Sequence, residues 1–168
     1  NNCPPANDDC PGAVTLTIQP PGGCPSGGTI GTTVNATYST SLPAPTCGTA
    51  GVSPVLRDVW YTFNTGTVAG PIYINFDQLT GTGHSIQFYT GNCGALVAAG
   101  CLAGGAQLAN PPANTTYYIR VISNSTTGVP GTFRLCLSGS SCQGVNLATF
   151  PTVSNITPLN AQYNFTTF

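Results

Sequence analysis

Residues 58–63 read Asp-Val-Trp-Tyr-Thr-Phe, and this stretch decides the fold class. Every second residue belongs to an apolar set, formed by Val59, Tyr61 and Phe63. Alternate side chains point to opposite faces only in an extended strand, so the pattern predicts a strand with one buried face. The other face carries Asp58, Trp60 and Thr62, and we expect Trp60 to point outward.

The same period of two recurs three times further along the chain. The apolar sets are Ile72, Ile74 and Phe76; then Tyr117, Ile119 and Val121; then Phe133, Leu135 and Leu137. Further strands are expected at 13–18, 29–38, 84–90 and 95–99, and no stretch has a helical period. Gly and Pro interrupt these strands about every eight to twelve residues. The sequence therefore predicts an all-β fold, an antiparallel β-sandwich of jelly-roll or immunoglobulin-like type with about eight to ten strands.

Charge is scarce throughout the chain. Charged residues make up 4% of the 168 residues, and Lys and Glu are absent, whereas an ordinary soluble domain carries about 25%. Three scattered arginines form no basic surface for nucleic acid or anionic lipid. The longest uncharged apolar run, residues 94–109, is interrupted by glycines, so we expect no membrane insertion. Four Asp and one His leave little for acid–base catalysis, so we expect neither an enzyme nor a cofactor.

The eight cysteines indicate an oxidising compartment. None has the spacing of a metal or haem site, so disulfides are expected and no bound metal is. We expect Cys93 to pair with Cys101 across the intervening loop, and Cys24 to pair with Cys47. One or two bridges should join Cys3 and Cys10 to Cys136 and Cys142. The chain contains no Met and starts with Asn1, which predicts a mature exported protein, secreted or at the cell surface.

Five stretches, taken together and in order, resemble a known family. They are ANDDCPGAVTLTI (6–18), DVWYTF (58–63), IQFYTGNCGAL (86–96), NTTYYIRV (114–121) and GTFRLCL (131–137). They are similar to the β-sandwich modules of secreted, cell-surface proteins of Bacteroidetes-type bacteria, related to pre-peptidase C-terminal and CUB-like domains. The resemblance implies an adhesive, glycan-binding or architectural role. In that family an acidic turn often follows the cysteine at the position of Cys101, and its replacement here by LAGGAQ argues against calcium there.

A few polar residues are candidates for specific roles. His84 is expected in a turn or on the surface, because no nucleophile and carboxylate accompany it in the sequence. Asp8 and Asp9 are expected to anchor the first strand by hydrogen bonds to the backbone, with calcium binding as the alternative. Asp58 is expected to form a buried ion pair with one of the three arginines: Arg57, Arg120 or Arg134.

Two sets of surface residues suggest contact with sugars. Trp60, Tyr73 and Tyr118 are the outward aromatic residues, and they predict either a glycan-binding platform or cross-strand packing. Sequons for N-glycosylation occur at Asn35, Asn114, Asn124, Asn155 and Asn164. We expect covalent glycans because a chain with so little charge needs another source of solubility.

The C-terminal segment suggests self-assembly. We expect one disulfide-bonded domain over residues 1–153 and a separate segment over 154–168. In that segment Leu159, Ala161, Tyr163 and Phe165 alternate with polar residues, which predicts an amphipathic strand. The strand either folds back on its own sheet as an extension strand or adds to a neighbouring copy, and the second arrangement generates a filament. The sequence thus favours a structural subunit of an extracellular fibre, with copies of itself as partner. The alternative is a monomeric glycan-binding or adhesion module.

Overall fold

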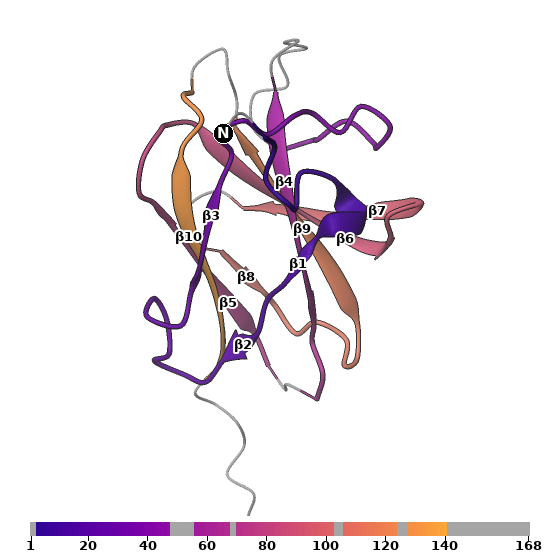
Figure 1. Cartoon of the computed structure of the whole chain (residues 1–168). Coiled ribbons are helices and arrows are strands. Elements are labelled where there is room, and N and C mark those ends of the chain that lie inside the picture. The colour runs from indigo at the N-terminus through magenta and orange to yellow at the C-terminus, as the bar shows by residue number, and fades with distance from the viewer. Residues whose placement is uncertain (1–2, 48–55, 68–69, 103–105, 124–127, 141–168) are drawn as a thin grey trace, which may run out of the picture.

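Two β-sheets packed face to face form the described part of the chain (Figure 1). The structure is a computed structural model, and it describes residues 3–47, 56–67, 70–102, 106–123 and 128–140. The first sheet has the order β1 (Val14–Thr15), β4 (Arg57–Asn64), β9 (Thr116–Ser123), β6 (His84–Asn92) and β7 (Ala95–Leu102). The second has the order β2 (Ile18–Gln19), β10 (Thr132–Gly139), β5 (Ile72–Gln78) and β8 (Ala106–Leu108), and β3 (Thr29–Thr32) also pairs with β10.

The predicted β-sandwich is confirmed, but its sheets are mixed rather than purely antiparallel. β1 runs parallel to β4, and β2 runs parallel to β10. Both short strands belong to one extended run that passes from the first sheet to the second. Leu16 lies between them, buried in the core, and its N–H donates to the carbonyl of Thr62 at 2.7 Å. This run therefore adds one short parallel strand to each sheet.

The core between the sheets is built from the alternating residues that the sequence pattern identified. Val59, Tyr61 and Phe63 from β4 join the inward sets of β5, β9 and β10 in one cluster, in which Phe76 is partly buried. The ring of Tyr61 meets that of Phe133 edge-on, with 6.0 Å between centroids. Gly31 of β3 lies against both rings, and a Cβ there would overlap the Tyr61 hydroxyl and the Phe133 ring. The strand β3 can therefore approach the core only with glycine at this position.

The N-terminal segment is anchored by Asp8, as its sequence predicts. One carboxylate oxygen of Asp8 accepts a hydrogen bond from the Thr37 backbone N–H at 2.6 Å, and the other accepts from the Thr37 hydroxyl at 2.7 Å. The chain then forms a single 3-10 turn, Cys10–Gly12, before β1. Among the described residues no helix is long and apolar enough to span a bilayer.

Three disulfides connect distant parts of the chain: Cys10–Cys93, Cys24–Cys136 and Cys47–Cys101. The predicted pairings Cys93–Cys101 and Cys24–Cys47 are therefore wrong. Residues 95–102 form a strand rather than a closed loop, and at about 3.3 Å per residue this strand carries Cys101 roughly 25 Å from Cys93.

The expected bridges from Cys3 and Cys10 to the last core strand are also not seen. Cys136 of β10 pairs with Cys24, in a turn packed on the outside of the second sheet. Cys3 is exposed and forms no disulfide with a described cysteine, and Cys142 lies outside the described residues. The expected domain boundary at 153 and the C-terminal strand also lie outside them.

Candidate functional site

A buried ion pair lies on the outer side of the first sheet, where β4 and β9 run side by side. Arg120 is the partner of Asp58, and both side chains are fully buried. The Arg120 Nε donates to Asp58 Oδ2 at 2.6 Å, and its Nη2 forms an ion pair with the same oxygen. The expectation of a buried Asp58–arginine pair is confirmed, and the structure selects Arg120 from the three arginines.

This ion pair holds the segment 37–47 against the sheet. Arg120 also donates to the carbonyl of Pro43 at 2.9 Å, and its guanidinium lies over the rings of Tyr38 and Trp60, 5.1 Å from each centroid. Asp58 accepts a hydrogen bond from the Ser39 hydroxyl at 2.9 Å. Burial raises the pKa of the Asp58 carboxyl, while the Arg120 guanidinium and the Ser39 hydrogen bonds act to lower it.

Trp60 is buried beneath this segment, so the expectation that it is an exposed residue of a glycan-binding platform is wrong. Its side chain lies on the outer face of the first sheet, as the alternation requires, but this face is covered. The Trp60 indole donates to the Ser39 hydroxyl at 3.1 Å and packs on the ring of Tyr89, with 5.7 Å between the ring centroids. With Cys10, these two aromatic residues form a second apolar cluster. Tyr118 is partly buried against this cluster.

The predicted three-residue glycan platform is therefore not assembled. Trp60 and Tyr118 belong to the outer face of the first sheet, whereas Tyr73 lies on the opposite, outer face of the second. Alternation in β5 buries Ile72 and Ile74 and leaves Tyr73 43% exposed. Of the three candidates, Trp60 is buried, Tyr118 is half-buried and Tyr73 is exposed.

The exposed residues around Tyr73 form a small polar surface, here called the Tyr73 face. Its members are Tyr73, Asn75 and Asp77 of β5 and Gln107 of β8. Gln107 is the register partner of Tyr73, so their side chains are neighbours across the two strands. Asp77 is held by Arg134 of β10 at 3.6 Å. An exposed aromatic ring beside the amides of Asn75 and Gln107 offers both stacking and hydrogen bonding to a ligand.

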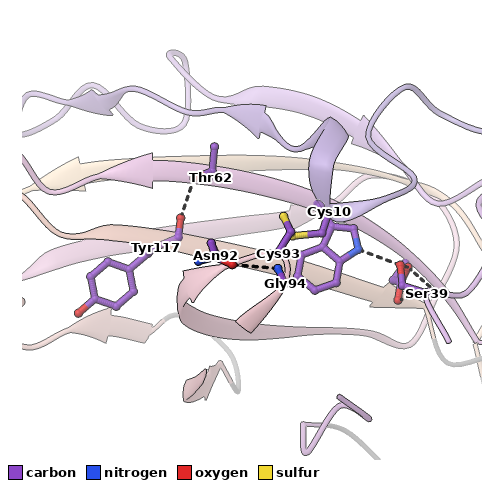
Figure 2. Close-up of a disulfide and its surroundings, with 9 residues drawn as sticks. Cys10, Ser39, Thr62, Asn92, Cys93, Gly94 and Tyr117 are labelled. Carbon is purple, nitrogen blue, oxygen red and sulfur yellow. Dashed lines mark hydrogen bonds between the residues drawn. A yellow bond between two sulfur atoms is a disulfide. The ribbon is translucent and has the colours of Figure 1, made fainter. Parts of the chain in front are cut away.

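A cavity of about 330 Å³ opens beside the second apolar cluster. It is lined by Asp9, Cys10, Pro11, Ser39, Ser41, Leu42 and Cys93. The Cys10–Cys93 disulfide joins the 3-10 turn to the end of β6 here, and Asn92 caps the following turn by accepting from the Gly94 N–H at 3.0 Å (Figure 2). Asp9 supplies the single ionisable side chain of the lining, so these residues hold no acid–base pair. Among the described residues no three side chains of His, Cys, Asp or Glu group as metal ligands do.

His84 begins β6 and is half-buried rather than located in a turn or fully on the surface. Its Nε2 lies 3.0 Å from the Thr33 hydroxyl, and its Nδ1 lies 3.1 Å from Gln78 Oε1. The ring packs against Phe76 and Phe133. Burial lowers the pKa of the imidazole, which favours the neutral form. These contacts are typical of a structural histidine, since neither ring nitrogen contacts a carboxylate.

Two of the five predicted glycosylation sequons lie in described turns. Asn35 and Asn114 both have a positive φ, 62° and 53° respectively. Asparagine adopts this conformation more readily than most residues. Asn114 is exposed, whereas Asn35 is half-buried. Asn124, Asn155 and Asn164 lie outside the described residues, as do the assembly-strand residues Leu159, Ala161, Tyr163 and Phe165.

The strand β7 is the outermost member of the first sheet and its only long edge strand among the described residues. Its sequence, ALVAAGCL, contains no charged residue and no proline. Ala99 is an extra residue opposite the Phe88–Tyr89 step of β6, so the ladder is regular from Ala95 to Ala98. Val97 is 63% exposed on this edge. Strand order is a long-range property, and the sequence pattern alone did not reveal this edge.

Comparison with protein families identifies the group to which the fold belongs. A family model described as galactose binding domain-like, and associated with the type IX secretion system (T9SS), matches residues 6–135. The match confirms the resemblance to cell-surface β-sandwich modules of Bacteroidetes-type bacteria. No curated protein matches the chain.

Replacing Arg120 with leucine tests the role of the buried ion pair. The variant should lose roughly 3–5 kcal/mol of unfolding free energy, because Asp58 remains buried without its partner. Urea denaturation measures this loss. The matched control is Arg134→Leu, which breaks the partly exposed pair with Asp77 and should cost about 1 kcal/mol or less. Equal losses in the two variants would contradict a central role for Arg120.

Proposed function

Because the chain belongs to the galactose-binding-domain-like family associated with the T9SS, we propose that it is a cell-surface module whose copies assemble into an extracellular fibre. The family and the three disulfides point to a secreted or cell-surface protein, since disulfides persist in oxidising compartments. The partner in the assembly is a second copy of the chain, and no catalytic step is part of the proposal.

The placement of the charged side chains supports this proposal. Asp58 and Arg120 form an ion pair in the interior. Asp8 is buried, and its carboxylate accepts a hydrogen bond from the Thr37 N–H. Asp77 and Arg134 pair with each other at 3.6 Å. The half-buried Arg57 donates to the carbonyl of Ala36. Among the described residues, Asp9 is then the one charged side chain that is exposed and forms no ion pair.

Such a surface has almost no electrostatic repulsion between copies. A net charge near zero favours association, and charged side chains on edge strands are the usual protection against strand addition. The formal net charge is −1 at pH 7. A surface of Thr, Ser, Asn and Ala suits a protein that is covered by copies of itself and by sugar.

Assembly should occur in the isolated protein and should depend little on salt. We expect fibres by electron microscopy, and sedimentation profiles that change little between about 0.05 and 0.5 M NaCl, because screening acts only where charges interact. A chain that stays monomeric by sedimentation at all accessible concentrations would overturn the proposal.

Covalent glycans are the second component of the proposed surface. Asn114 is the most accessible described sequon, because it is exposed in the turn before β9. In the protein from its natural source, the peptide that contains Asn114 should therefore have a mass above that of the bare peptide. Asn114→Gln should remove the mass of one glycan, and a bare mass in the unsubstituted protein would contradict the proposal.

A second candidate function, saccharide binding without assembly, is favoured by the Tyr73 face. The exposed ring of Tyr73 can stack on the apolar face of a sugar, and the side chains of Asn75 and Gln107 can bond its hydroxyls. The galactose-binding-like fold of the family is compatible with this function.

A glycan array tests the saccharide-binding candidate directly. Saturable binding should fall about tenfold or more in Tyr73→Ala, because the stacking surface is lost. The matched control is Val129→Ala, which changes an exposed residue away from this face and should bind as the unsubstituted chain does. Absence of binding, or equal binding by both variants, would exclude the Tyr73 face as a sugar site.

A further inference from the structure

We infer that residues 95–98 of β7 accept, as an added β-strand, residues 159–165 of a second copy of the chain. The inference rests on the proposed self-assembly and identifies the surface through which it occurs. β7 forms a ladder with β6 on one side, and no described strand pairs with its other side. Its free backbone groups therefore form a template for one more strand.

The local geometry limits the acceptor to the first half of β7. Ala95 to Ala98 pair in regular register with Asn92 to Tyr89 of β6, and the bulge at Ala99 ends this ladder. Beyond the bulge, Cys101 is bonded to Cys47, which brings another segment beside the strand. The accepting edge is thus four residues long, free of proline and charge, and close to the tip of the hairpin.

The two faces of β7 differ in what an added strand could bury. Leu96 packs against the second apolar cluster with Trp60 and Tyr89. Val97 lies on the other face, opposite Thr90, which itself pairs with Tyr117 of the main core. Val97 is 63% exposed, so this core-side face is left open at the edge of the sheet. An added strand with an apolar face toward Val97 would close it.

The segment 159–165 has the pattern that this edge requires. Leu159, Ala161, Tyr163 and Phe165 provide one apolar face with a period of two, and Asn160, Gln162 and Asn164 provide the polar face. The 20 residues from Ser140 to Leu159 span up to about 65 Å when extended. The eight residues of β4 measure about 26 Å, so the linker can reach the β7 edge of an adjacent copy.

A contact between one copy's C-terminal segment and another copy's β7 is heterologous. Each copy contributes one donor segment and one acceptor edge, so repetition without ring closure produces an open fibre. The affinity would come from main-chain hydrogen bonds, and the specificity from side chains that cover Val97.

Two substitutions in the full chain separate donor from acceptor. Val97→Lys places a charge on the accepting edge, and Tyr163→Lys places one in the apolar face of the donor. Each variant alone should need about tenfold or more higher concentration to form fibres, because a charge at the contact opposes strand addition. The matched control is Val129→Lys, which changes a residue of similar exposure (61%) outside any strand and should assemble normally.

Mixing the two variants gives the decisive result. Val97→Lys keeps an intact donor segment, and Tyr163→Lys keeps an intact acceptor edge. In an equimolar mixture the donor of the first variant should therefore bind the acceptor of the second. The 1:1 dimer that results has no intact donor or acceptor left, so assembly should end there. Amides of residues 95–98 should become protected from hydrogen exchange in these dimers. If Val97→Lys forms fibres as readily as the unsubstituted chain, or the mixture stays monomeric, the inference is wrong although self-assembly stands. If the unsubstituted chain forms no fibres, the proposed function itself fails.

Discussion

The buried ion pair between Asp58 and Arg120 is the interaction that holds the segment 37–47 on the outer face of the first sheet. Removing two charges from water costs several kcal/mol per ion, and this is recovered only when both are paired and hydrogen-bonded. The partners that complete the pair, Ser39 and Pro43, lie on the segment 37–47 rather than in the sheet. Sheet and segment must therefore become ordered together, and Trp60 and the loop bearing Cys47 are fixed as a consequence.

Period-two patterns reveal which face of a strand is buried, and on this point the sequence was a sufficient guide. The inward residues of β4, β5, β9 and β10 were all identifiable because a core between two sheets selects apolar side chains at alternate positions. The same pattern cannot show whether the other face meets water or a covering segment. Trp60 was misassigned for this reason, since the cover comes from residues around Ser39 that are close in space but not in the strand.

Long-range pairings were beyond the reach of spacing arguments. The sequence predicted a buried pair of Asp58 with one of the three arginines, but strand order decided that the partner is Arg120. Cys93 and Cys101 are near each other in sequence and far apart along a hairpin, so each bonds to a segment from elsewhere. Tyr73 was found correctly as an outward residue, whereas the edge position of β7 follows only from the arrangement of all five strands of its sheet.

The arginines have one more consequence, for the survival of the protein outside the cell. Trypsin-like proteases cut after Lys or Arg in segments that can be drawn into an extended, accessible conformation. This chain has no Lys, and Arg57, Arg120 and Arg134 all lie within paired strands of the two sheets. Arg120 is fully buried, and Arg134 is paired with Asp77. The folded protein therefore offers such enzymes no exposed loop in which to cut, and its degradation by them requires that a sheet first open.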